Sequence, residues 1–235
     1  MATKALDIPP SQRLGFRRVY VWQLPVRLYH WLNAFCVAVL CATGFLIGHP
    51  TAMTYSSEAY QQYWFGTVRF LHFSTAFIFF FNYLFRVYWG FAGNDYAKWT
   101  NFILLKKSQW REMAEVLRVD ILQTRARRLI SLGHNALAGL TYVLMLLAFL
   151  FQAATGFALY SSMSHSWLPR MFAWVVPLMG GDSAVRQWHH TVMWIFIVFV
   201  LIHVYLVVYH DYNEGQGTMS SMVSGWKFER DKSNE

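Results

Sequence analysis

The chain has 235 residues, of which 56% are apolar and 14% are charged, whereas soluble globular domains carry roughly 25% charged residues. This composition excludes an ordinary soluble domain, and the 19% aromatic content, with 11 Trp, is typical of chains that contact both interfaces of a membrane. The net charge of +8 does not indicate a nucleic-acid partner, because the basic residues gather at the ends of apolar segments and not on one face of a soluble fold.

Four apolar stretches are long enough to cross a bilayer as helices, which takes about 20 residues. They run near 29–48, 69–91, 134–158 and 188–209. The predicted fold class is an all-α membrane protein, a four-transmembrane-helix bundle that forms a single domain over residues 1–235. Two of the stretches share the tetrapeptide A-T-G-F, at 42–45 and 154–157, and its glycine allows a helix or a flat ligand to approach closely.

Lys and Arg are distributed unequally among the connections between these stretches. Of the 20, 17 lie in the N-terminal segment, between Arg86 and residue 133, or in the C-terminal tail. The other three are Arg69, Arg170 and Arg186. Because cytoplasmic loops carry the excess of Lys and Arg, both termini and the middle connection are predicted to be cytoplasmic.

The two long connections are not simple polar loops. In the cytoplasmic one, apolar residues recur at helical intervals among basic ones, at Ile103, Trp110, Met113, Leu117 and Ile121. This pattern predicts an additional interfacial helix on the cytoplasmic membrane face. The external connection, 161–186, is unusually apolar, so it either lies in the interface or is covered by a partner protein, and the sequence leaves both alternatives open.

Histidines at the ends of the spans are the main functional signal, because ionisable side chains are costly in a bilayer. His189 and His203 lie 14 positions apart, which places them on one helix face and about 21 Å apart along its axis. The predicted orientation puts His72 level with His189, near the external face. It puts His30 level with His203, near the cytoplasmic face. Two such pairs of imidazoles suit the binding of iron porphyrins from both axial sides, and without a C-x-x-C-H motif such a haem would have no thioether link.

An Arg stands three residues before three of these histidines, in R-L-Y-H at 27–30, R-F-L-H at 69–72 and R-Q-W-H at 186–189. This spacing puts both side chains on nearly the same helix face. Arg27, Arg69 and Arg186 are therefore candidates to hold haem propionates, because a guanidinium pairs well with a carboxylate. The alternative, that these side chains only reach lipid head groups, has most weight at Arg27.

The remaining histidines have weaker claims to a ligand role. His190 points about 100° away from His189 around the helix. His134 lies at the depth of His30 and competes with it as a ligand. With Asn135, in G-H-N, it could instead line a quinone pocket.

Five stretches of the chain carry a family resemblance. They are RLYHWLNAFCVAVLCATG at 27–44, RFLHF at 69–73, GHN at 133–135, TGFALYS at 155–161 and RQWHHTVMWIFIVFVLIH at 186–203. They resemble the b-type cytochrome subunit of membrane-bound nickel–iron uptake hydrogenases, and the likeness covers nearly the whole chain. Gln187 and Thr191 depart from the second signature, but neither is a candidate ligand.

The resemblance, which extends to formate dehydrogenase gamma subunits, implies a membrane anchor in the bacterial cytoplasmic (inner) membrane. It implies two b haems, the outer one held by His72 and His189 and the inner one by His30 and His203. Electrons would pass from the iron–sulfur small subunit of the hydrogenase to membrane quinone, and the small and nickel–iron large subunits would dock on the external face. Hydrogen would be oxidised in the partner, and whether this chain itself completes quinone reduction stays open.

Two other interpretations are kept. The chain could be the cytochrome b subunit of a formate, thiosulfate or sulfite dehydrogenase-like complex, or a free-standing cytochrome. A different class is a histidine-lined metal or proton transporter. Proton pathways usually contain carboxylates, and none of the four predicted spans contains Asp or Glu, which counts against the transporter.

Overall fold

The computed structural model of the protein describes residues 16–50, 63–102, 107–116, 118 and 136–230. Long helices dominate these residues, namely α1 (Leu24–Gly48), α2 (Trp64–Ala92), α4 (Ala136–Ser161) and α7 (Asp182–Glu214). All four are long and apolar enough to cross a membrane. They confirm the predicted all-α bundle, and α7 extends beyond the predicted span at both ends, with Asp182 in its first turn and Asp211 in its last.

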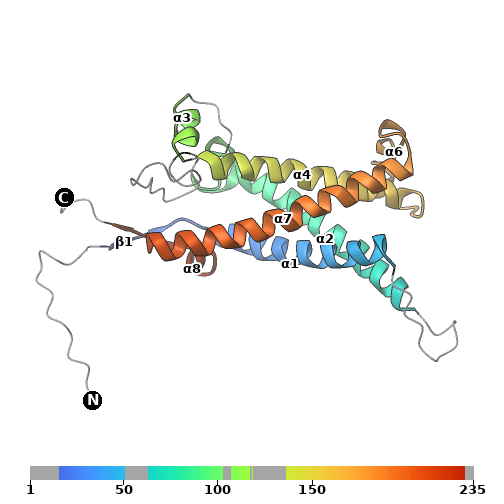
Figure 1. The fold of residues 1–235 in the computed structure, drawn as a ribbon, viewed down its shortest axis with the longest axis horizontal. Coiled ribbons are helices and arrows are strands. Elements are labelled where there is room, and N and C mark those ends of the chain that lie inside the picture. The colour runs from blue at the N-terminus through green and yellow to red at the C-terminus, as the bar shows by residue number, and fades with distance from the viewer. Residues whose placement is uncertain (1–15, 51–62, 103–106, 117, 119–135, 231–235) are drawn as a thin grey trace, which may run out of the picture.

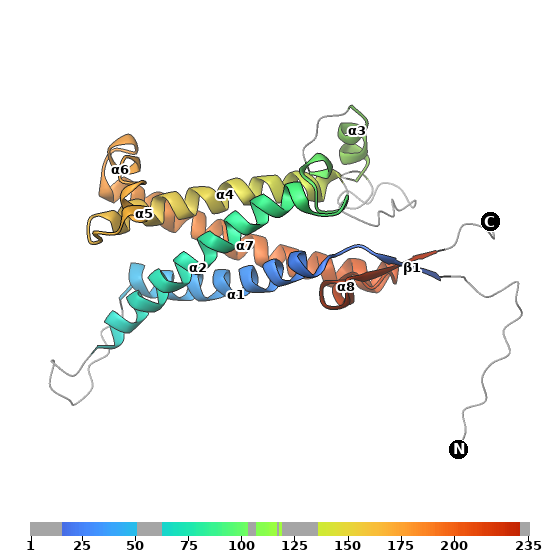
Figure 2. The same ribbon diagram turned by 180° about the vertical axis from the view of Figure 1, so that it is seen from behind.

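The four long helices lie lengthwise beside one another (Figure 1). α1 packs against α2 and α7, and α4 packs against α7 and α2. α2 and α7 therefore face each other across the diagonal of the bundle. The short helices α5 (Trp167–Arg170) and α6 (Val175–Leu178) lie at one end, whereas α3 (Lys107–Val116) and α8 (Thr218–Ser224) lie at the other (Figure 2).

Phenyl rings from three helices fill the middle of the bundle. Phe149 of α4 stacks on Phe196 of α7 with ring centroids 4.9 Å apart, and Phe79 of α2 meets Phe149 edge-on at 5.1 Å. Cys36 of α1 is fully buried in the same cluster. This aromatic core ties all four long helices together at mid-depth.

Large apolar side chains also cover the outside of the bundle. Phe35, Phe70, Phe81, Leu147 and Leu201 are all exposed on the long helices. Contiguous apolar surface of this extent is not stable in water, but it is what a helix bundle presents to lipid tails. The fold is therefore that of a multi-pass membrane protein, as the composition predicted.

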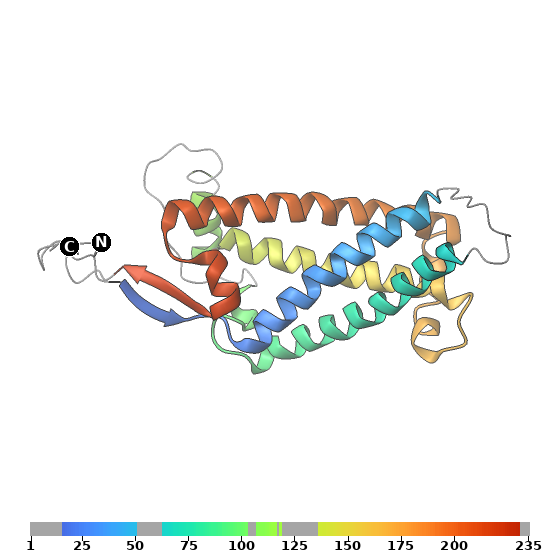
Figure 3. The ribbon, with the colours of Figure 1, turned by 90° about the horizontal axis from the view of Figure 1, so that it is seen from below.

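A two-stranded sheet, which the sequence analysis did not predict, joins the two ends of the described chain. Strand β1 (Phe16–Tyr20) pairs antiparallel with β2 (Trp226–Arg230) in a register that sets Tyr20 opposite Trp226. Their rings lie 5.0 Å apart. The sheet projects from the end of the bundle that carries α3 and α8 (Figure 3), so the described segments nearest both termini lie on the same side, as four crossings require.

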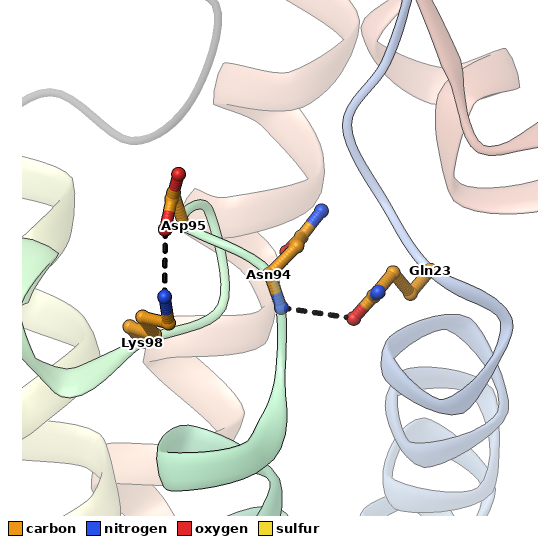
Figure 4. A network of polar contacts seen from close by, with 4 residues as sticks. All are labelled: Gln23, Asn94, Asp95 and Lys98. Carbon is orange, nitrogen blue, oxygen red and sulfur yellow. Dashed lines mark hydrogen bonds and ion pairs between the residues drawn. The ribbon is translucent and has the colours of Figure 1, made fainter.

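The start of α1 is held against the turn that follows α2. The short 3-10 helix η3 (Trp99–Asn101) comes shortly after this turn. Gln23 Oε1 accepts hydrogen bonds from the backbone N–H of Asn94 at 3.0 Å and from the indole of Trp89 at 3.2 Å. Beside it, Lys98 forms an ion pair of 2.8 Å with Asp95 (Figure 4). These contacts fix how α1 and α2 enter the bundle.

A helix, α3, is present where an interfacial helix was predicted, and it contains Trp110 and Met113. Its position at the membrane interface stays a prediction. Ile103, Leu117 and Ile121 lie outside the described residues, so the rest of its apolar pattern stays a prediction.

The connection between α4 and α7 folds back on the end of the bundle. Leu168 is buried against Phe80 and Phe157, whereas Trp167 and Trp174 are exposed. Whether this connection lies in the membrane interface or is covered by a partner protein therefore concerns only its exposed side.

Candidate functional site

His30 and His203 face each other where α1 packs against α7. We call them the inner pair, after the predicted orientation. Their ring centroids are 6.4 Å apart and the rings are tilted by 53°. Phe199 stacks on His203 at 5.5 Å, one turn earlier on α7. The Nδ1 atom of His30 is buried and has no hydrogen-bond partner.

The geometry of the inner pair fits an iron atom between the rings. A metal–imidazole bond is about 2 Å and the nitrogen lies about 1 Å from its ring centroid, so two imidazoles on opposite sides of one iron have centroids about 6 Å apart. The observed separation of 6.4 Å agrees with this value.

His72 and His189, which we call the outer pair, are each held by a threonine from a neighbouring helix. Nδ1 of His72, on α2, lies 2.8 Å from the hydroxyl oxygen of Thr43 on α1. Nδ1 of His189, on α7, lies 2.8 Å from that of Thr155 on α4. Both hydroxyl groups also donate to the carbonyl four residues earlier in their own helix, at 2.6 Å and 2.8 Å.

A glycine follows each of these threonines and lies against the same imidazole. A Cβ atom added to Gly44 would be 3.4 Å from Cε1 of His72 and 3.5 Å from Sδ of Met193. One added to Gly156 would be 3.1 Å from Cε1 of His189. The two A-T-G-F tetrapeptides therefore form matching contacts in which threonine binds the ring and glycine leaves room for it.

The two pairs lie at different depths. The contact between Thr43 and His72 sets the level of the outer pair on α1, 13 positions beyond His30, which is about 20 Å along the helix. On α7 the separation of 14 positions gives about 21 Å. The aromatic core with Phe196, midway between His189 and His203, lies between them.

The structure places the three arginines at the ends of the bundle, beside the histidines that they precede. Arg27 donates from Nη1 to the carbonyl of Val223 at the end of α8, and its Nε is buried without a partner. Arg69 donates to the sulfur of Met163 at 3.0 Å. Arg186 is exposed on α7. None of these three arginines forms an ion pair with another described residue.

The competing histidines separate from the two pairs. The ring of His190 packs against Gly48 of α1, and its centroid is 5.4 Å from that of His49. It thus turns to the α1 side of α7, whereas His189 binds Thr155 of α4. His134 and Asn135 lie outside the described residues.

Two residues at the site, Thr43 and Thr155, were not identified from the sequence, and the burial of Arg86 elsewhere in the bundle was not predicted either. Thr43 and Thr155 gave only the repeated tetrapeptide as a signal. Arg86 was counted among the border residues, but it is 2% exposed and its guanidinium lies 5.0–5.4 Å from the rings of Tyr142, Trp99 and Phe102. It also donates to the carbonyl of Ala97 at 3.1 Å. The only sequence signal for the burial of Arg86 was its place at the end of a predicted span that is followed by aromatic residues.

Comparison with known proteins assigns the arrangement to a family. The family model for prokaryotic cytochrome b561 matches residues 21–225. The chain belongs to this family. A protein of Cupriavidus necator named "Probable Ni/Fe-hydrogenase B-type cytochrome subunit" is 39% identical over 92% of this chain and 90% of its own length. A protein of Azotobacter vinelandii with the same name is 38% identical over 91% and 90%.

A further relative, from Escherichia coli, is named "Probable Ni/Fe-hydrogenase 1 B-type cytochrome subunit" and is 34% identical over 88% of this chain and 90% of its own length. The resemblance inferred from the sequence is thus confirmed. As a member of the cytochrome b561 family, the chain is a b-type cytochrome, a membrane protein of electron transfer that carries haem b. The facing imidazoles of His30 and His203 fit the donor set that haem b needs in such a bundle.

Proposed function

We propose that this cytochrome anchors a nickel–iron hydrogenase to the bacterial cytoplasmic membrane and relays electrons from the iron–sulfur small subunit to quinone. It binds two haem b groups, one between His72 and His189 and one between His30 and His203. Haem held by two histidines has no open iron position, so it serves as a one-electron carrier and not as a site of oxygen or substrate binding.

One observation carries the proposal, namely that two pairs of imidazoles lie about 20 Å apart along the same bundle. A single pair would serve a single cofactor near one membrane face. Two pairs near opposite ends of helices that are long enough to cross a membrane connect one aqueous face with the other. The names of the relatives support the hydrogenase as partner.

The protein supplies position and electrostatics around each haem. Phe149 and Phe196 keep water out of the space between the pairs. Arg69 and Arg186 at one end and Arg27 at the other are placed to hold propionates, because each precedes its histidine by three residues. Positive charge beside a haem disfavours its oxidised form, so these arginines raise the potential at which it is reduced.

The orientation follows the distribution of basic residues. The outer pair then lies near the external face, where the hydrogenase subunits dock beside α5 and α6, and the inner pair lies near the cytoplasmic face. Quinone is reduced at the inner end, with His134 and Asn135, just before α4, as the proposed contacts.

The test is a haem count on the complex purified from membranes, combined with a redox titration. Two haems per chain and two titrating components are expected. His189→Ala should remove one component and stop hydrogen-dependent quinone reduction, and His203→Ala should remove the other. A preparation with one haem per chain, or full haem content in both variants, would refute the two-haem relay.

A partner test is independent of the haem count. Pull-down of the tagged chain from membranes should recover a protein that contains nickel and iron. Recovery of a molybdenum or tungsten enzyme instead would assign the chain to a formate dehydrogenase-like complex.

A further inference from the structure

In the outer pair, a threonine hydroxyl group lies within hydrogen-bond distance of one ring nitrogen of each histidine. The two contacts come from different helices, α1 and α4, yet have the same length, 2.8 Å, and involve the same atom, Nδ1. Each threonine belongs to an A-T-G-F tetrapeptide. Because the same contact occurs in two separate pairs of helices, it indicates that both imidazoles need a hydrogen-bond partner at Nδ1.

The direction of each hydrogen bond follows from the single proton of the hydroxyl group. Thr43 donates that proton to the carbonyl of Val39 at 2.6 Å, and Thr155 donates to that of Phe151 at 2.8 Å. The hydroxyl oxygen is then left as an acceptor toward the histidine. Nδ1 must carry the ring proton, so Nε2 keeps its lone pair.

We propose that Thr43 and Thr155 are positioning residues that fix His72 and His189 as the tautomer with a free Nε2 and aim that nitrogen at the iron of the outer haem. This inference rests on the proposed function and extends it to two residues that do not touch the haem iron. A second partner on the far ring nitrogen orients a metal-bound histidine and makes it a stronger ligand.

The glycine of each tetrapeptide completes the arrangement. Because Gly44 and Gly156 have no Cβ, the Cε1 edge of each imidazole can approach the helix that carries its threonine. A larger residue would push the ring away from the hydroxyl group. Threonine and glycine at consecutive positions thus fix both the rotation and the height of the ring.

The inner pair has no corresponding hydrogen bond between a ring Nδ1 and a threonine hydroxyl group among the described residues. Nδ1 of His30 has no hydrogen-bond partner, and His203 is held by stacking on Phe199. We therefore expect the threonines to affect only the outer haem. A stronger ligand stabilises oxidised iron, so loss of the hydroxyl group should raise the potential of the outer haem and leave the inner one unchanged.

The experiment compares Thr155→Val and Thr43→Val with the matched control Thr141→Val in the purified complex. Thr141 lies on α4 and makes the same bond to the carbonyl four residues earlier, Leu137, at 3.0 Å. The readouts are haem per chain after exposure to a haem-scavenging protein, the potential of each component, and the EPR g-values of the oxidised outer haem. Thr155→Ser and Thr43→Ser, which keep the hydroxyl group, should restore all three.

For each valine variant we expect haem affinity at the outer site to fall about 10- to 100-fold. The reduced-to-oxidised ratio of any retained outer haem should rise on the order of tenfold at a fixed ambient potential, which is about 59 mV for one electron. Thr141→Val should match the parent protein. Should Thr155→Val assemble no outer haem, Thr155→Ser decides, because recovery supports the proposal and no recovery overturns it.

Failure of this inference is distinct from failure of the proposed function. If Thr155→Val and Thr43→Val give the same redox titration as Thr141→Val while His189→Ala still lacks one haem, the role of the threonines is overturned. The two-haem relay then stays intact. Full haem content in His189→Ala overturns both.

Discussion

The outer and inner halves of the bundle each contain a pair of proposed haem ligands, but the two pairs are held differently. His72 and His189 come from helices that face each other across the diagonal, and each ring is bound by a threonine from a third or fourth helix. His30 and His203 come from helices that pack directly against each other, and aromatic rings hold them. The outer site is thus oriented by hydrogen bonds, whereas the inner site depends on packing. Residues that border each site should therefore act on one haem only.

The largest effects should come from the ligands themselves, and they test whether the two halves are independent. His72→Ala should remove the outer haem and His30→Ala the inner haem, each leaving the other titrating component in place, because no residue is shared between the pairs. Haem per chain and difference spectra measure this. His190→Ala is the control beside the outer pair and should keep both haems, since the ring of His190 packs on Gly48. Equal losses of haem in His190→Ala and His189→Ala would mean that the ligand was misassigned.

The next largest effects should come from the glycines, which sharpen the contrast within the outer half. Gly156→Ala places a Cβ 3.1 Å from His189, whereas Gly44→Ala places one 3.4 Å from His72, so the first should weaken outer haem binding more. A loss of roughly tenfold in haem affinity is expected for Gly156→Ala. Gly66→Ala on α2, where a Cβ meets nothing within 4 Å, is the control. Loss of the inner haem in Gly156→Ala would contradict the separation of the two sites.

Smaller shifts are expected from the arginines, one for each half. Arg69→Gln should lower the potential of the outer haem and Arg27→Gln that of the inner haem, because removal of a nearby positive charge favours the oxidised form. The expected size is on the order of 1 kcal/mol per charge. Separate redox titrations measure both shifts. Unchanged potentials in both variants would show that the guanidinium groups only contact lipid head groups or protein.

The smallest effect should come from Asp95, at the end of the bundle that carries the inner pair. A hydrogen bond from Lys98, together with its charge, holds the pKa of the Asp95 carboxyl below its ordinary value. This lowered pKa stabilises the fold above the unfolded pKa of about 3.9, and the effect is lost as the pH falls through the lower folded value. Because the pair is exposed, Asp95→Asn should leave the thermal midpoint at pH 7 nearly unchanged. A large drop would show that the turn in Figure 4 supports the inner half more than its contacts indicate.

Much of the fold could be predicted because it depends on local patterns. Long apolar segments without carboxylates predicted the four helices, and α1, α2, α4 and α7 lie where they were expected, with ends that differ by a few residues. The apolar and basic alternation around Trp110 predicted α3. The sheet of β1 and β2 was missed, because strands this short become stable only when segments from both ends of the chain meet.

The candidate site was predictable in its depths but not in its contacts. Fourteen positions between His189 and His203 give the spacing of the two levels, and helix geometry makes that spacing independent of the rest of the fold. The partners of Nδ1 could not be derived, because Thr43 and Thr155 lie 29 and 34 positions from the histidines that they contact. The burial of Arg86 under rings from two later segments was equally out of reach.

The sequence by itself determined the helical crossings and the difference in depth between His189 and His203, and it predicted the side of the membrane that carries most of the basic charge. All three follow from quantities that hold for any helix in a bilayer, namely rise per residue, residues per turn and the cost of charge in lipid. Only the tertiary structure decided which helices are neighbours, and with that which hydroxyl group reaches which imidazole. The physical reason is that such contacts depend on how side chains interlock across helix surfaces, and that packing is a property of the whole bundle.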